Sequence, residues 1–280
     1  DPVHAIAVLA TIYVSATFAG SITAILINTP GTSAAAATTF DGYPLAQKGE
    51  AGRALGVAVI SSTVGGVFSV IVLCFAAPLL ARVAYEFRSP EYFALTVFGL
   101  SMLASISAGG AVKNLIGGIF GVWLSTIGAE RVTGIERFMF GNYELYEGLH
   151  FVPIFIGLFA ISELLVQSKT VNKIVNTVSM KDVKLPTKED YKKIWKTILR
   201  SCGIGTFIGV LPAEGATVAS MIGYSEARRW SKNKEEFGKG SIEGIAGAEA
   251  ANNSATGGAM VPTMVLGIPG SGTTAIILVG

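Results

Sequence analysis

The chain has 280 residues, of which 51% are hydrophobic and only 14% are charged, and its formal net charge is +2. Soluble domains carry about 25% charged residues, so this composition excludes an ordinary water-facing surface. The weak net charge gives no basic field for nucleic-acid binding, and the sequence contains no Cys or His pattern of a structural metal site.

Apolar stretches long enough to cross a bilayer follow one another along most of the chain. A transmembrane helix needs about 20 predominantly apolar residues. We therefore expect an all-α integral membrane protein with several spans. The expected spans are 3–27, 54–81, 91–108, 111–127, 150–167, 201–225 and 245–266, with a further one starting near 272.

One clearly polar connection, 168–200, interrupts this series of spans. It holds nine Lys or Arg residues against three acidic ones, which indicates a cytoplasmic location. We expect a first-repeat transmembrane region over 1–167, this basic cytoplasmic linker, and the start of a second-repeat transmembrane region over 201–280.

Two Pro-Gly pairs lie on opposite sides of the linker in similar surroundings. The segments 13–35 and 252–274 align without gaps when these pairs are superposed. The coinciding residues include Ser15, Ala16, Thr17, Pro30, Gly31 and Thr32 in one copy and Ser254, Ala255, Thr256, Pro269, Gly270 and Ser271 in the other. Repeated membrane halves with Gly- and Pro-interrupted segments are typical of secondary transporters, so we expect internal, inverted repeats with broken or re-entrant helices.

Each Pro-Gly pair is expected to break a helix at an anion-binding site. Such a break persists in a membrane only where it lines a cavity or is buried in protein. The Ser and Thr residues after each pair are good N-caps, and a half-helix starting there directs free N–H groups and a positive dipole end at a ligand. The expected substrate-binding residues, which include two amides of a nearby polar cluster, are Asn28, Thr29, Pro30, Gly31, Thr32, Ser33, Asn252, Asn253, Gly270, Ser271, Gly272 and Thr273.

The polar cluster over 249–258 also supplies the amide and hydroxyl oxygens that a hard cation such as sodium requires. Intramembrane carboxylates indicate function by default, so proton coupling stays open beside sodium coupling. The ion-coupling candidates are Ser15, Thr17, Glu214, Glu249, Ser254 and Thr256. Ser15 and Thr17 could equally well bond only to their own helix. Beyond the coupling ion, Na⁺ or H⁺, no cofactor is expected.

Enzyme motifs are incomplete in this sequence. The stretch G-I-P-G-S-G-T-T over 267–274 lacks the lysine of a phosphate-binding loop, and G-I-G-T-F-I-G over 203–209 follows no expected strand. No nucleophile–base motif appears, so an enzyme is not expected. Two alternatives to a transporter stay open: a membrane scaffold or assembly subunit without a transport path and, less favoured, a membrane-embedded enzyme.

Two long stretches, 20–56 and 209–275, resemble the signatures of the large membrane subunit of tripartite tricarboxylate transporters. They contain "NTPGTSAAAATTFDGYP" and "AEAANNSATGGAMVPTMVLGIPGSGTT". The resemblance implies a multi-pass permease of the bacterial inner membrane, with an elevator-like fold, that takes up di- or tricarboxylates such as citrate by symport with an ion. It also implies a small membrane subunit and a periplasmic substrate-binding protein as partners, and it leaves a homo-oligomer open.

Residue by residue, the resemblance covers both Pro-Gly segments and the polar cluster. The matching positions are Asn28, Thr29, Pro30, Gly31, Thr32, Glu249, Asn252, Asn253, Gly267, Pro269, Gly270, Ser271 and Gly272. Ala213-Glu214 departs from the family, which usually has a glycine after Leu-Pro. Family members are much longer, so we expect a fragment. Its missing N-terminal piece would carry a Leu-Pro-Gly element that pairs with Leu211-Pro212.

Overall fold

The computed structural model of the chain describes residues 1–91, 93–94, 97–98, 111–130, 133–150, 153–154, 156–161, 165, 168, 185–211 and 215–279. These residues are mostly helical, and the strands among them are one short antiparallel pair, β1 (Gly128–Ala129) and β2 (Glu136–Arg137). The expected all-α class is confirmed. The chain divides into two compact units, Asp1–Tyr85 with Ile174–Leu278, and Glu86–Lys173 with Val279–Gly280.

The first unit is a bundle of helices and short helical turns. Its elements are α1 (Pro2–Ile27), η1 (Ser33–Ala35), α2 (Ala36–Leu45), η2 (Ala46–Glu50), α3 (Ala51–Ala84), α8 (Lys188–Val210), α9 (Gly215–Trp230), η5 (Lys234–Glu236), α10 (Ile242–Leu266) and α11 (Gly272–Val279). Gly49 has φ 82°, and this left-handed residue bends the chain between α2 and α3.

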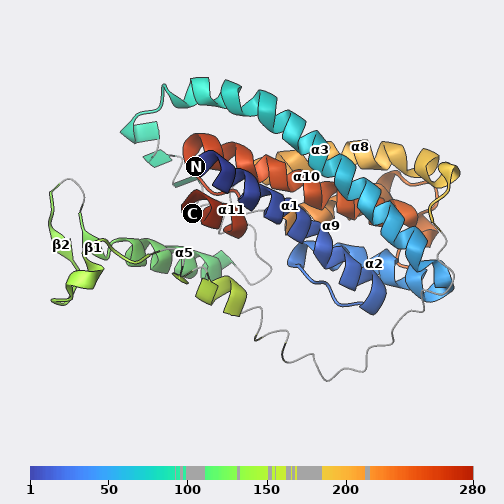
Figure 1. The fold of residues 1–280 in the computed structure, drawn as a ribbon, viewed down its shortest axis with the longest axis horizontal. Helices are drawn as coiled ribbons and strands as arrows, with labels where there is room; N and C mark the ends of the chain where they lie inside the picture. The colour runs from blue at the N-terminus through green and yellow to red at the C-terminus, as the bar shows by residue number, and fades with distance from the viewer. Residues whose placement is uncertain are drawn as a thin grey trace. The chain divides into compact units, whose positions relative to one another are not determined.

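Helix α10 runs through the centre of this unit and is buried from Ile242 to Thr263 (Figure 1). Helices α3, α8 and α9 pack along it. Small residues allow this close approach: a Cβ added to Gly205 of α8 would overlap the Ala251 carbonyl oxygen and the Ser254 hydroxyl. The polar side chains of α10 are therefore enclosed by protein.

Helices α1 and α3 present apolar faces to the outside of the unit. The stretches His4–Ile27 and Ser33–Ala84 are long and apolar enough to cross a bilayer. Large exposed side chains on α1 and α3 include Val8, Ile12, Val67, Val70, Ile71, Phe75 and Leu79. Such rows of exposed apolar side chains suit contact with lipid, because they bring no unpaired polar group into the hydrocarbon.

Most of the expected spans correspond to observed helices. The spans 3–27, 54–81, 111–127, 245–266 and the one near 272 match α1, α3, α5 (Ala111–Ser125), α10 and α11. The span 91–108 lies largely outside the described residues, and the described part of 150–167 contains η4 (Ile156–Ile161).

The expected span 201–225 contains two helices. Helix α8 ends at Val210, and α9 starts at Gly215 with a left-handed φ of 59°. Helix α8 also starts earlier than expected, inside the polar stretch, because Thr187 and Asp190 form a capping box there. The helical stretch is therefore interrupted between α8 and α9, and the start of α9 helps to form the candidate site.

The second unit contains α5, the β1–β2 pair, η3 (Tyr143–Leu145) and η4 (Ile156–Ile161). A largely apolar cavity of about 910 Å³ lies in it, with Phe120, Leu124, Ile127, Leu149 and Ile154 among its lining residues. None of the residues expected to bind substrate or ion lies in this unit.

Candidate functional site

The first Pro-Gly break begins where α1 ends. Asn28 is left-handed, with φ 54°. The Thr29 N–H donates to the Thr23 carbonyl at 3.4 Å, and the Gly31 N–H donates back to the Gly20 carbonyl at 3.1 Å. The Thr29 bond reaches back six positions from the residue that follows the left-handed one, one position further than the bond of a Schellman helix ending. The chain therefore leaves α1 and folds back against it.

The second Pro-Gly break comes after α10 in the same way. Gly267 is left-handed, with φ 67°. The Ile268 N–H donates to the Pro262 carbonyl at 3.4 Å, again across six residues. The Gly270 N–H donates to the Thr263 hydroxyl at 3.2 Å. This segment therefore folds back onto α10.

The two breaks match at the left-handed residue, at the bond that reaches six positions back and at the glycine, although the two glycine N–H groups donate to non-equivalent acceptors. In the gap-free sequence alignment, the left-handed residues coincide, and so do the donors and acceptors of the two closures. A Cβ added to Gly31 would lie 2.9 Å from the Gly20 Cα, and one added to Gly270 would lie 2.8 Å from the equivalent Ala259 Cα. Close packing on their own helix therefore accounts for both glycines.

The two breaks differ in the residues after the glycine. The Ser271 hydroxyl accepts a hydrogen bond from the Thr274 N–H at 3.2 Å and caps α11. Thr32 stands in the cap position of η1, but its buried hydroxyl has no hydrogen-bond partner among the described residues. The next residue, Ser33, has its hydroxyl 2.8 Å from that of Thr217.

Both breaks lie against the start of α9. The Ser33–Thr217 contact joins the first break to the first turn of α9. A Cβ added to Gly215, the first residue of α9, would lie 3.6 Å from the Ser271 Cβ. The Tyr13 hydroxyl lies 3.2 Å from that of Ser271. The start of α9 therefore lies beside both η1 and the start of α11. A helix start carries a positive dipole end and unpaired N–H groups.

Helix α11 supplies free donors to this region. The N–H groups of Gly272 and Thr273 lie in its first turn, and no hydrogen bond from them occurs among the described residues. Asn28 and Thr29 are exposed and belong to the helix ending that precedes the turn. The hydroxyls of Ser33, Thr217 and Ser271 and the amides of α11 are thus the groups best suited to contact a carboxylate.

A second polar cluster surrounds Glu249, which is fully buried on α10. Its carboxyl group accepts hydrogen bonds from the hydroxyls of Ser21 at 2.6 Å and Ser62 at 2.8 Å, and from that of Thr38. These donors come from α1, α3 and α2. Three helices therefore contribute to holding one carboxyl group inside the bundle.

Asn252 and Asn253 follow Glu249 on the same face of α10. Both are fully buried. The Asn252 side chain interacts with the Glu249 carboxyl group, whereas neither amide atom of Asn253 has a hydrogen-bond partner among the described residues. Side chains three and four positions apart on a helix are neighbours. Buried polar groups in native proteins are nearly always hydrogen-bonded. A polar ligand on this face of α10 would supply the missing partners.

The other ion-coupling candidates have local partners or lie elsewhere. The hydroxyls of Thr17, Ser254 and Thr256 donate to carbonyls of their own helices at 2.9, 3.2 and 2.6 Å. Ser15 is exposed on α1, and Glu214 lies outside the described residues. Among these candidates Glu249 is the one held by several helices.

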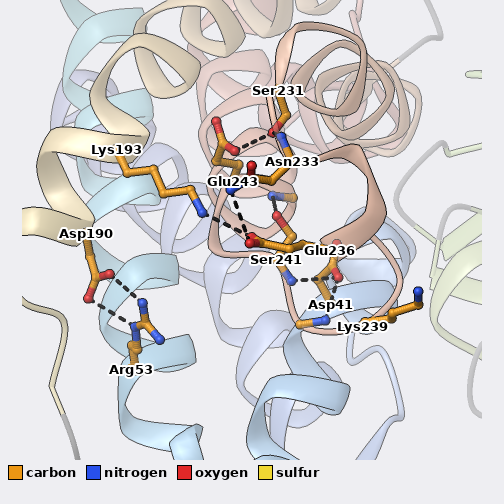
Figure 2. A network of polar contacts seen from close by, with 12 residues as sticks. Asp41, Arg53, Asp190, Lys193, Ser231, Asn233, Glu236, Lys239, Ser241 and Glu243 are labelled. Atoms are coloured by element: carbon orange, nitrogen blue, oxygen red, sulfur yellow. Dashed lines mark hydrogen bonds and ion pairs between the residues drawn. The ribbon is translucent and has the colours of Figure 1, made fainter.

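A further network holds the N-terminus of α10 (Figure 2). The Asp41 carboxylate on α2 accepts hydrogen bonds from the N–H groups of Gly240 and Ser241, both at 2.8 Å. Arg53 on α3 binds the Asp190 carboxylate on α8 at 2.5 and 3.0 Å. Partial burial opposes ionisation of Asp190, but the hydrogen bonds it accepts outweigh burial and lower its pKa. These contacts fix the bundle without joining the candidate site.

Sequence reasoning missed four hydroxyl residues of these clusters. Thr217 had no signal beyond its place after a Leu-Pro element. Ser21, Thr38 and Ser62 are single hydroxyls in helical stretches, separated from Glu249 by 187 to 228 positions. Only the packing of α1, α2 and α3 on α10 reveals them.

The whole chain, residues 1–280, matches the tripartite tricarboxylate transporter TctA family. An uncharacterized 52.8 kDa protein in the TAR-I ttuC' 3' region of Agrobacterium vitis is 42% identical over 280 residues, covering 99% of this chain and 55% of that protein. An uncharacterized protein in the TAR-II ttuC' 3' region of the same organism is 46% identical over 74 residues, covering 26% of this chain and 31% of that protein.

The chain thus spans about half the length, 55%, of the longer of these two matches. No solved structure matches it. The family match extends over both Pro-Gly breaks and the buried face of α10. The chain belongs to the tripartite tricarboxylate transporter TctA family.

Proposed function

We propose that the protein is a permease subunit of a secondary transporter and binds a di- or tricarboxylate where its two Pro-Gly breaks meet α9. The main support is that the two breaks are equivalent. Both close with a hydrogen bond that reaches six positions back, and both lie against the first turn of α9. A helix start in a membrane protein favours an anion without needing a lysine or arginine.

The donors suit a substrate with more than one carboxylate. Ser33 and Thr217 lie on one side, and Ser271 with the first turn of α11 lies on the other. Hydrogen bonds from backbone N–H groups to a charged carboxylate are stronger than neutral ones. We infer that separate carboxylate groups of one substrate are held by separate helix starts.

We infer that the two breaks belong to two inverted repeats of an elevator-like carrier. Transporters built from such repeats hold their substrate near the bilayer midplane at discontinuous helices. The matched endings of α1 and α10 support this reading, because the same interruption occurs in two separate segments of the chain. The first unit carries both breaks and would be the substrate-bearing body.

We further propose that an Na⁺ or H⁺ gradient drives uptake across the bacterial inner membrane. The family name, tripartite tricarboxylate transporter, supports partner subunits, and we propose a small membrane subunit and a periplasmic substrate-binding protein. Uptake is to be measured with labelled citrate and with dicarboxylates, in vesicles that contain these partners, with the Na⁺ and H⁺ gradients varied separately.

The matched pair Ser271→Asp and Ser271→Asn tests the anion site. Both replacements are good N-caps, so α11 keeps its first turn in each. The Asp variant adds a negative charge beside the bound carboxylate and should lower uptake at least tenfold, while the neutral Asn variant should stay within about threefold of wild type.

If the two variants take up substrate equally well at equal amounts in the membrane, the second break does not form the anion site. Uptake that also survives Ser33→Asp would favour the alternative of a scaffold subunit without a transport path. Both comparisons use the intact subunit together with its partners.

A further inference from the structure

We propose that α10 carries a buried site for a monovalent cation, formed by the Glu249 carboxylate and the side-chain oxygens of Asn252 and Asn253. Its role in coupling rests on the proposed transport function, whereas its existence does not. The site is separate from the helix breaks and lies inside the bundle, where α1, α2 and α3 pack on α10.

The first argument is the charge of Glu249. The residue is fully buried, and its hydrogen-bond donors are neutral hydroxyls. Among the described residues, the basic side chains that form ion pairs do so with other carboxylates, as Arg53 does with Asp190. A buried charge without a counter-charge costs several kcal/mol. Either a proton on this carboxyl group or a cation beside it removes that cost.

The second argument is the state of the two amides. Asn252 and Asn253 share a helix face with Glu249. The Asn252 side chain interacts with the Glu249 carboxyl group, and both amide atoms of Asn253 are buried without a partner among the described residues. Hard cations take carboxylate, amide and water oxygens as ligands. A partly hydrated cation would satisfy both ends of the Asn253 amide, since its oxygen contacts the ion and its NH₂ group donates to a water on the ion, and the Asn252 oxygen would be a further ligand.

The ligand set selects a monovalent ion. A divalent cation would leave an uncompensated positive charge in this buried site, because this face of α10 offers one carboxylate. The nearest described acids on the same elements are engaged elsewhere. Asp41 accepts hydrogen bonds from Gly240 and Ser241, and Glu243 accepts one from Ser231 at 2.5 Å. One carboxylate with neutral oxygens matches Na⁺ or Li⁺ in charge.

Two elements connect this site to the helix breaks. On α1, Ser21 binds Glu249 while Tyr13, about two turns away, contacts Ser271 of the second break. Helix α2, which contributes Thr38, begins directly after the first break. A cation that draws α1 and α2 onto α10 would therefore also position the breaks, which is the requirement for coupling an ion to a carboxylate.

The test is thermal unfolding of the intact subunit in detergent, without carboxylate, at constant ionic strength. Replacing choline chloride by NaCl or LiCl should raise Tm saturably by about 3–5 °C, because a ligand that binds only the folded state stabilises it. Glu249→Gln and Asn253→Ala should each abolish this shift. Glu243→Gln, a buried Glu-to-Gln change on the same helix, should retain it.

Several results would overturn the site. They are a wild-type Tm that no alkali cation raises and a shift that persists in Glu249→Gln. A Tm that depends on pH but not on alkali cations, and loses that pH dependence in Glu249→Gln, would make Glu249 a proton site. Should Glu249→Gln fail to fold, Asn252→Ala and Asn253→Ala carry the same prediction. If Na⁺ raises Tm saturably but the protein takes up no carboxylate, the cation site is supported and the proposed transport function is wrong.

Discussion

The two Pro-Gly breaks have the same backbone course but different endings. Each starts with a left-handed residue, closes across six residues and packs its glycine against its own helix. After the glycine they diverge. The second break enters α11 through a hydroxyl cap at Ser271, whereas the first enters a short turn and leaves the Thr32 hydroxyl buried without a described partner.

This difference separates structural from functional residues within one motif. The shared part, from the left-handed residue to the glycine, sets the direction of the chain and is explained by packing alone. The divergent part contains the hydroxyls and free amides that face α9. We therefore expect substitutions in the shared part to act on folding and substitutions after the glycine to act on binding.

The largest effect is expected at the two glycines. A side chain at Gly270 or Gly31 would overlap backbone atoms of the preceding helix, at 2.8 and 2.9 Å from added Cβ atoms. Gly270→Val and Gly31→Val should each destabilise the fold by about 1–3 kcal/mol. Thermal unfolding of the detergent-purified protein measures this, and uptake should be lost in both variants.

Gly203→Val is the matched control, because an added Cβ there meets no atom within 4 Å. It should unfold close to wild type. If only one of the two break variants is destabilised, the breaks are not structural equivalents. If both unfold like the control, the packing role assigned to these glycines is wrong.

A smaller effect is expected from the hydroxyl residue after each glycine. Ser271→Ala removes a helix cap and should cost about 1 kcal/mol. Thr32→Val removes a buried hydroxyl that has no hydrogen-bond partner among the described residues, so the free energy of unfolding should stay unchanged or rise. Denaturant titration of both variants distinguishes them. Equal destabilisation by the two changes would mean that Thr32 has a structural partner like that of Ser271.

The smallest effect is expected at the left-handed residues. Asn28→Gly converts the first break into the sequence type of the second, and Gly267→Asn does the reverse. The first change should be neutral or slightly stabilising, and the second should cost about 0.5–1 kcal/mol, because glycine adopts positive φ without strain. Uptake by Asn28→Gly should stay within about twofold of wild type. A larger loss would mean that the Asn28 amide contacts the substrate.

Much of the bundle follows from local sequence. The ends of α1, α3 and α10 lie close to the boundaries of apolar runs, and the Pro-Gly pairs mark both breaks. Helix α2 was missed because its sequence, A-A-T-T-F-D-G-Y-P-L, contains polar residues, Gly and Pro, and resembles a loop. The sequence placed α8 and α9 in one apolar span, because apolar residues continue on both sides of Leu211, and only the family resemblance singled out Leu211-Pro212.

The composition of each site could not be predicted, because it depends on packing between distant segments. The sequence identifies Glu249 as a costly intramembrane acid, yet its three donors lie on three other helices. Thr217 becomes part of the candidate anion site only because α9 starts beside Ser33. The polar cluster was interpreted as one substrate and ion region, whereas its side chains lie on a buried, continuous helix.

The central claim is that both breaks form one anion site, and substrate protection of introduced cysteines tests it most directly. Ser33→Cys and Ser271→Cys are made separately in a protein lacking the exposed Cys74 and the buried Cys202, and maleimide labelling is followed as citrate is added. The account predicts that citrate slows labelling at both positions with the same half-maximal concentration. Protection of one position alone, or of the two at different concentrations, would contradict it.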